Sequence, residues 1–259
     1  MPSKKLSIVT PVFNERDNIP EFVRRLTLAL KASPVTYEII FAVDPSTDGT
    51  EELIRTLHKK DRRIKMLRFS RRFGQPAATM AGISLATGDG VLVIDVDLQD
   101  PPEVVPEMVK SWLAGSKLVL AQRRSRVGEP VTKKIISRIG YSFLNRFSDV
   151  PIPADTGDFR LMDRQVVNEL KRFPESNAFL RGLIALVGFE SHTVEFDRPE
   201  RFSGKTKYNK FFGSLRIGFN GIVGYSTALL SLSTYVGFFM ALAAVLAAIV
   251  YGIAKIAGA

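Results

Sequence analysis

The 259-residue chain contains no cysteine, only two histidines and a single tryptophan. The absence of cysteine excludes disulfide bonds, a thiol nucleophile and a cysteine-ligated metal. His58 and His192 have no ligand partner at useful spacing, so we assign them no role. The first apolar segment is followed by Phe13-Asn14-Glu15-Arg16, so the glycine pattern of a Rossmann dinucleotide site is missing, and so is a P-loop.

Charged residues are also missing between Ile217 and Ala254. Within this stretch, Ala228–Val250 exceeds the roughly 20 apolar residues that cross a bilayer. A buried core helix is a poor alternative, because no polar face is present to meet water. The sequence therefore predicts a transmembrane helix at the C-terminal end of the chain.

The predicted span divides the chain into three parts. We expect a catalytic domain over residues 1–207, an amphipathic helix in the membrane interface over residues 208–225, and the transmembrane helix over residues 226–254. Basic residues precede the span, and by the positive-inside rule they place the domain on the cytoplasmic side of the inner cell membrane; they are Arg201, Lys205, Lys207, Lys210 and Arg216.

Lysine and arginine outnumber aspartate and glutamate by 36 to 26. A basic chain attracts anionic lipid or nucleic acid, but no recognisable nucleic-acid-binding motif is present. We therefore expect a membrane partner and no nucleic acid. The sequence does not define the oligomeric state, and a homo-oligomer is compatible with it.

Strand and helix patterns alternate through the first half of the chain, which predicts an α/β fold with a mostly parallel sheet covered by helices on both faces. The expected strands are Leu6–Val12, Glu38–Val43, Ile64–Phe69, Gly90–Asp95 and Leu118–Ala121. The expected helices between them are Ile19–Leu30, Thr50–Lys59, Ala77–Ala86 and Glu103–Ala114.

The fourth strand leads into Asp95, Asp97 and Gln99, which are spaced by twos. In a strand this spacing puts all three side chains on one face, and α/β sheets bind ligands just beyond the carboxyl ends of their strands. Carboxylate and amide oxygens suit Mg²⁺ or Mn²⁺. The alternative is an acidic strand-to-helix turn in which Asp100 caps the next helix and no metal binds.

The first two strands end at the same expected edge, at Glu15 and Asp44. Asp44 can accept a hydrogen bond from a base N–H, and Glu15 can take a ribose hydroxyl. Helix capping by Asn14 and Thr50 is the alternative, and both roles fit one loop. We expect a nucleotide held by its base and sugar, with its diphosphate on a metal.

Four motifs resemble those of family 2 glycosyltransferases, and within that family those of the polyprenyl-phosphate sugar transferases: P-V-F-N-E, D-P-S-T-D-G-T, D-V-D-L-Q-D-P-P-E and T-G-D-F-R-L. This group includes bactoprenol glucosyltransferases and dolichol-phosphate mannose synthases. The resemblance implies a GT-A fold and inverting transfer of one hexose from a nucleotide-sugar to a lipid phosphate. Because bactoprenol glucosyltransferases usually end in two membrane helices, it also implies a second span beyond residue 259.

Motif matching also implies the site residues. The nucleotide-sugar contacts fall at Pro11, Phe13, Glu15, Asp44, Asp95 and Lys207, and the metal and diphosphate contacts at Asp95, Asp97 and Gln99. The acceptor-phosphate positions match Arg123, Lys133 and Ser137, for which a solvated basic face is the alternative.

Three residues are expected to act nearest the chemistry: Asp158, Asp97 and Arg201. Asp158 would orient the acceptor or serve as base, and Arg160 would pair with it or with the diphosphate. Asp155 is the weaker alternative carboxylate. The segment from Arg201 to Tyr208 resembles the loop that closes over donor phosphates in the family, where Arg201 and Lys207 neutralise charge on the leaving diphosphate.

The leading hypothesis is a metal-dependent transferase that makes polyprenyl-phosphate glucose from UDP-glucose and a lipid such as undecaprenyl phosphate. The rivals are a GDP-mannose-dependent mannose synthase and a non-catalytic, membrane-tethered nucleotide-sugar sensor. A processive polysaccharide synthase would normally show Q-x-x-R-W, and the sole tryptophan, Trp112, is not in such a context.

Overall fold

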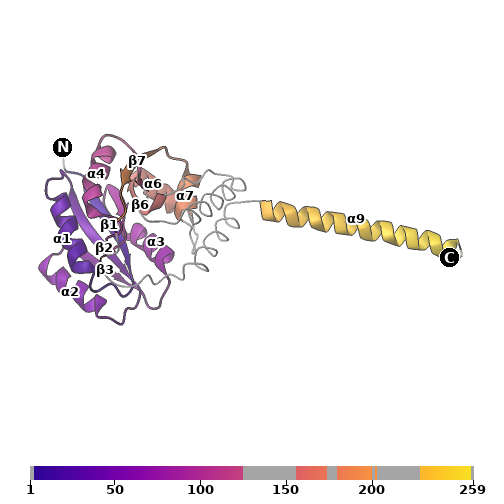
Figure 1. Cartoon of the computed structure of the whole chain (residues 1–259), viewed down its shortest axis with the longest axis horizontal. Helices are drawn as coiled ribbons and strands as arrows, with labels where there is room; N and C mark the ends of the chain where they lie inside the picture. Colours follow the sequence, from indigo (N-terminus) through magenta and orange to yellow (C-terminus); the bar gives the residue numbers. More distant parts are fainter. Residues whose placement is uncertain (1–2, 125–155, 174–179, 200–201, 203–227, 258–259) are drawn as a thin grey trace.

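The computed structural model describes most of the α/β body and one long C-terminal helix (Figure 1). The described residues are 3–124, 156–173, 180–199, 202 and 228–257. The expected boundaries at residues 207 and 225, and the amphipathic helix over residues 208–225, lie outside them.

A single seven-stranded sheet forms the centre of the body, with the strand order β3-β2-β1-β4-β6-β5-β7. Only β6 runs antiparallel to its neighbours, β4 and β5, so the prediction of a mostly parallel sheet is confirmed. The strands are β1 (Lys5–Val12), β2 (Thr36–Val43), β3 (Ile64–Arg68), β4 (Gly90–Val93), β5 (Leu118–Arg123), β6 (Thr156–Asp163) and β7 (Ser191–Phe196).

Helices cover both faces of this sheet (Figure 1). Apolar side chains of α1, α2 and α4 pack into one core cluster, and those of α3, α6 and α7 pack into a second on the opposite face. The helical segments are α1 (Ile19–Leu30), α2 (Thr50–Lys60), α3 (Gln75–Leu85), the 3-10 turn η1 (Pro102–Val104), α4 (Val105–Leu113), α6 (Arg164–Leu170), α7 (Leu180–Val187) and α9 (Ala228–Ile256).

The helix α1 shows how the sequence pattern produces this packing. Ile19, Phe22, Leu26 and Leu30 are spaced by three or four residues, which places them on one side of a helix, and all four are buried. Pro20 stands in the first turn, where its missing N–H costs no hydrogen bond. The observed bounds agree with the prediction.

The segment after β4 corrects one expectation. The strand ends at Val93 rather than Asp95, so Asp95, Asp97 and Gln99 lie on a loop and not on one strand face. Leu98 adopts a left-handed backbone conformation with φ of 63°, which bends the chain. Burial still alternates as expected, because Val96 and Leu98 pack into the core while the polar residues between them stay partly exposed. The following helix begins with the turn η1.

The C-terminal helix α9 extends away from the α/β body (Figure 1). Its segment Ser233–Ile256 has a mean hydropathy of 2.4, and none of it is buried against the rest of the chain. A helix that is apolar all round and is not buried against the described part of the chain fits the interior of a bilayer. The prediction of one helix able to span a membrane is confirmed by length and composition.

Candidate functional site

The loop Asp95–Asp100, here called the aspartate loop, leaves the carboxyl end of the central strand β4. Asp97 Oδ1 accepts a hydrogen bond from the backbone N–H of Gln99 at 3.1 Å, which closes the turn around Leu98. Gln75 Nε2, at the start of α3, donates to Asp95 Oδ1 at 3.0 Å. The carboxylates of Asp95 and Asp97 therefore face the edge where parallel strands end.

Carboxylates gather at this loop. Burial, followed by the charges of Asp100, Asp97 and Asp158, raises the pKa of Asp95 well above its usual value. Burial also dominates at Asp100 and, together with Asp97 and Asp158, raises its pKa to about 6, although the charge of Arg123 acts in the opposite direction. Like charges held this close favour either protonation or a bound cation.

Two arginines reach the aspartate loop from the part of the sheet that contains β5 and β7. Arg123, the last residue of β5, places Nη2 3.7 Å from Asp100 Oδ1. Arg198, just beyond β7, donates from Nη2 to Gln99 Oε1 at 2.6 Å. The sequence predicted Arg123 as an acceptor-phosphate contact and not as a partner of Asp100, and Arg198 was missed. Its only signal was its place three residues before Arg201 in the same basic stretch.

Asp158 lies on β6 and contributes to the same electrostatic field. Its Oδ1 accepts a hydrogen bond from Arg181 Nε at 3.0 Å and lies 3.5 Å from Arg160 Nη2. Burial opposes its ionisation, but the charges of Arg181 and Arg160 outweigh burial and lower the pKa of Asp158. Asp158 is therefore held as a carboxylate. The pairing with Arg160 was predicted from the sequence, whereas the contact from Arg181 on α7 was not.

The expected nucleotide contacts line the next part of the same edge. Arg72 stacks over the Phe13 ring with its guanidinium carbon 4.1 Å from the ring centroid. Pro11 lies near the end of β1, and Glu15 follows it and accepts a hydrogen bond from Asn18 Nδ2.

The Asp44 side chain follows β2 and is buried. Its two oxygens accept hydrogen bonds from the backbone N–H groups of Phe73 and Gly74, at 3.0 and 2.9 Å. These bonds hold the loop between β3 and α3 against the site. Asp44 thus has a structural role beside the base contact expected from the sequence.

Four of the expected site residues lie outside the described residues: Lys133, Ser137, Arg201 and Lys207. The alternative carboxylate Asp155 does too. The described members of the site are Pro11, Phe13, Glu15, Asp44, Asp95, Asp97, Gln99, Arg123 and Asp158, and they come from β1, β5, β6 and the loops that follow β1, β2 and β4.

The chemistry of the aspartate loop fits a hard divalent cation. Asp95 and Asp97 supply carboxylate oxygens, which suit Mg²⁺ or Mn²⁺. The buried Asp100 Oδ1 accepts no hydrogen bond within the described part of the chain, so negative charge there is incompletely compensated. Among the described residues no three His, Cys, Asp or Glu side chains converge on one point, so a metal held here would complete its coordination with the donor phosphates.

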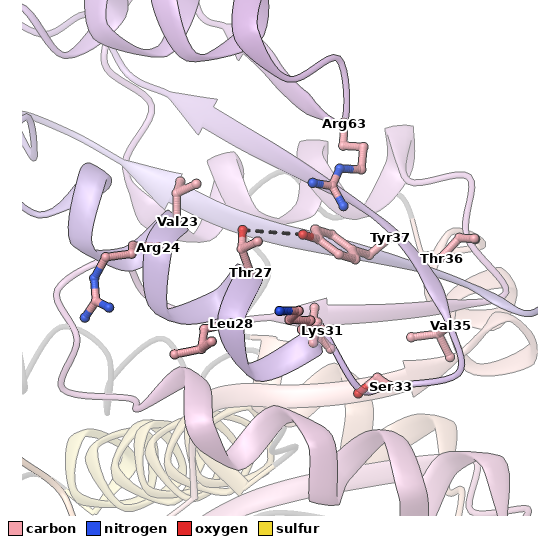
Figure 2. Close-up of a pocket in the computed structure, with 11 residues that line it drawn as sticks. Val23, Arg24, Thr27, Leu28, Lys31, Ser33, Val35, Thr36, Tyr37 and Arg63 are labelled. Atoms are coloured by element: carbon pink, nitrogen blue, oxygen red, sulfur yellow. Dashed lines mark hydrogen bonds between the residues drawn. The ribbon is translucent and has the colours of Figure 1, made fainter.

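A groove of about 890 Å³ lies elsewhere, between α1 and the start of β2 (Figure 2). Leu28, Val35 and Tyr37 contribute to its lining, with Arg63 at the rim, and Tyr37 Oη donates to Thr27 Oγ1 at 3.4 Å. None of the expected site residues lines it. The groove is therefore separate from the carboxylate-rich edge.

The chain is similar in sequence to several known proteins. The sequence model described as "Glycosyl transferase family 2" matches residues 7–171. The chain is 43% identical over 234 residues to the uncharacterized glycosyltransferase YkcC of Bacillus subtilis, covering 90% of this chain and 72% of that protein. It is 40% identical over 237 residues to the bactoprenol glucosyl transferase of Shigella phage SfV, covering 92% and 77%.

Solved structures show the same fold. Glucosyl-3-phosphoglycerate synthase from Mycobacterium tuberculosis, in complex with Mn²⁺, UDP-glucose and phosphoglyceric acid, superposes with a TM-score of 0.60. The match covers 85% of this chain and 79% of that structure at 20% sequence identity. The expected mixed α/β architecture with a mostly parallel sheet is therefore confirmed.

Proposed function

Because the chain belongs to glycosyl transferase family 2, we propose that it transfers one hexose from a nucleotide-sugar to a polyprenyl phosphate at a membrane. The 40% identity to a bactoprenol glucosyl transferase over most of the chain carries this proposal. Glucose from UDP-glucose is the favoured donor sugar, and undecaprenyl phosphate is the favoured acceptor.

The aspartate loop forms the donor side of the proposed site. Asp95 and Asp97 hold a divalent cation, Mg²⁺ or Mn²⁺, with Gln99 beside them. Such a cation, when bound, neutralises the diphosphate of the donor and so makes it a better leaving group. Phe13, Glu15 and Asp44 line the part of the edge that takes the nucleoside. The Mn²⁺ and UDP-glucose bound by the mycobacterial synthase support this arrangement at the level of the fold.

The acceptor is itself a nucleophile. A lipid phosphate is largely a dianion at neutral pH, so its oxygen can attack the anomeric carbon while the bond from that carbon to the diphosphate oxygen breaks. No proton has to be removed, and the nucleoside diphosphate leaves with the electron pair of the broken bond. Attack from the opposite side inverts the configuration at the anomeric carbon.

The pairing of Asp158 with Arg160 and Arg181 indicates its role. Its paired and ionised state makes it a weak base, so it serves to orient Arg160 and Arg181 toward the reacting phosphates. On the acceptor side, Arg123 supplies a positive charge next to the acceptor phosphate. Lys133 and Ser137 complete the proposed acceptor-phosphate site. Arg201 and Lys207 are proposed to neutralise charge on the leaving diphosphate.

The apolar helix α9 explains why a lipid acceptor is accessible. We propose that it anchors the enzyme in the inner cell membrane with the α/β body on the cytoplasmic side. The basic residues that precede the span support this orientation.

The test is transfer of radiolabelled sugar from UDP-glucose or GDP-mannose to undecaprenyl phosphate in the presence of Mg²⁺, Mn²⁺ or EDTA. We expect metal-dependent label in the lipid phase from UDP-glucose. Label from GDP-mannose alone would change the donor to mannose. Donor binding without transfer from either donor would contradict the enzyme hypothesis and favour a nucleotide-sugar sensor.

A further inference from the structure

Arg198 occupies an unusual position for a surface arginine. Its guanidinium donates to Gln99 Oε1 at 2.6 Å, although the two residues are 99 positions apart. The backbone N–H of Phe202 also approaches the backbone oxygen of Asp97, at 3.5 Å. The chain that follows β7 is thus attached to the aspartate loop at two points, and one of them is a charged side chain.

The charges around Arg198 explain why it lies there. Partial desolvation and the neighbouring cation Arg123 lower the pKa of Arg198, whereas the charges of Asp100, Asp97 and Asp95 attract it and act in the opposite direction. Arg123 is already directed at Asp100, with 3.7 Å between their charged atoms. One cation on the Asp100 side does not balance the carboxylates of the loop, and Arg198 supplies a second positive charge on the Gln99 side.

The contact with Gln99 has a direct chemical consequence. The same amide oxygen was expected to serve as a metal ligand, and a guanidinium bonded to it would lie beside a divalent cation at that oxygen. Two cations at one oxygen repel each other. Arg198 therefore has to leave Gln99 if Gln99 is to take part in metal binding. The side chain of Arg198 is exposed, so it can move without disrupting the core.

We propose that Arg198 is a counter-cation of the aspartate loop, which pairs with Gln99 and passes to the diphosphate of the incoming donor. A planar guanidinium binds phosphate oxygens in a bidentate manner, so the diphosphate is a better partner for it than a neutral amide. This inference rests on the proposed function for the identity of the donor. Its consequence is that the free protein binds metal weakly and that metal and nucleotide bind together.

The two halves of this proposal predict effects of opposite sign in one variant. Arg198→Gln removes the resident positive charge, so Mn²⁺ alone should bind about fivefold more tightly to the full-length protein in detergent. The same variant loses a phosphate ligand, so UDP in the presence of saturating Mn²⁺ should bind about tenfold more weakly. Isothermal titration with each ligand measures both constants without any turnover.

Matched variants separate this effect from a general structural one. Arg124→Gln removes an equivalent positive charge from the exposed pair with Glu195, 3.0 Å apart, and should leave both constants within about twofold of the wild type. Arg198→Lys keeps the positive charge but lacks the planar guanidinium that binds phosphate in a bidentate manner. Mn²⁺ affinity should therefore stay at the wild-type level while UDP affinity falls. If Arg198→Gln does not fold, the lysine variant still tests the second half.

Unchanged or weaker Mn²⁺ binding by Arg198→Gln would overturn the counter-cation role, and unchanged UDP binding would overturn the transfer to the diphosphate. Failure of the proposed function is distinguishable, because it would appear as absence of sugar transfer in the wild type. Binding of Mn²⁺ and UDP is measured independently of that transfer.

Discussion

Buried carboxylates lie at both ends of the sheet, in opposite electrostatic settings. Toward the amino end, Glu38 accepts hydrogen bonds from the hydroxyls of Ser7 and Thr87, at 2.6 and 2.9 Å. The ammonium groups of Lys5 and Lys65 lie 2.9 and 2.6 Å from its other oxygen. Burial acts against ionisation, but these partners together lower the pKa of Glu38 far below its usual value.

At the carboxyl end, by contrast, Asp95 and Asp100 face other carboxylates, and their pKa values are raised. Glu38 is thus paired with two cations at the amino end, whereas negative charge is in excess at the carboxyl end, where a cation and a diphosphate are proposed to bind. We infer that the amino end contributes mainly to stability, whereas the carboxyl end is the proposed binding site. Changes at the two ends should therefore have separable effects on activity and on unfolding.

The largest expected effect is on catalysis at the carboxyl end. Asp97→Asn removes a proposed metal ligand, so turnover should fall by about a thousandfold or more. Because the change also removes like-charge repulsion, the free energy of unfolding of the metal-free protein should stay equal or rise. Label transfer and denaturant unfolding measure the two quantities. Near-normal turnover would remove Asp97 from the metal site.

The converse experiment is at the amino end. Glu38→Gln breaks two ion pairs around a buried group, so the free energy of unfolding should fall by about 2 kcal/mol. Turnover per folded molecule should be unchanged at low temperature. As a control, Glu21→Gln removes one exposed pair with Arg24 and should lower the free energy of unfolding much less than Glu38→Gln does. Equal costs for the two variants would contradict the stabilising role of Glu38.

The two ends should also respond oppositely to pH in the presence of EDTA. The folded-state pKa of Glu38 is below its unfolded value, so its stabilisation is present above about pH 4.5 and is lost as the pH falls further. The pKa of Asp100, about 6, lies above its unfolded value, so its contribution becomes more favourable as the pH falls from 7 toward 4.

Unfolding free energy should therefore rise by about 1–2 kcal/mol between pH 7 and pH 5 in the metal-free protein, and then fall at lower pH. Denaturant unfolding across this range is the measurement. Asp100→Asn should abolish most of the rise, and Glu38→Gln should reduce the fall. A rise that persists in Asp100→Asn would assign it to another carboxylate.

The smallest effect on unfolding is expected at a second polar contact at the amino end of the sheet. Trp112 Nε1 donates to Asp163 Oδ2 at 2.9 Å, and the indole is buried. Trp112→Phe removes this bond and leaves an aromatic ring, so the free energy of unfolding should fall by about 1 kcal/mol. Turnover at low temperature should not change. A loss of turnover in the folded variant would contradict the separation between the two ends.

The sequence was informative where local patterns decide the structure. The spacing of Ile19, Phe22, Leu26 and Leu30 predicted α1 with its observed bounds, and the apolar run before Asp95 predicted β4 and the sheet edge beyond it. Both elements could be predicted because the spacing of their apolar residues is visible within one segment of the chain. The expected residues Asp95, Asp97, Arg123 and Asp158 do contribute to one electrostatic field.

Contacts that depend on distant segments were not predictable in this way. Gln75, Arg181 and Arg198 reach the site from α3, α7 and the end of β7, and no motif connects them to the aspartate loop. The left-handed conformation of Leu98 was missed because it costs a leucine about 1–2 kcal/mol. Burial of its side chain in the core offsets that cost.

The antiparallel strand β6 has a consequence for how new specificities arise. Gln122 on β5 is paired with Thr156 on β6, so residues 123–155 begin and end at neighbouring points of the sheet. The free-energy cost of closing a loop grows only slowly with its length. An insertion, deletion or exchange between these points would therefore leave the strand order intact. Exchange of this one segment would change the proposed acceptor residues Lys133 and Ser137 and leave the proposed donor-binding residues in place.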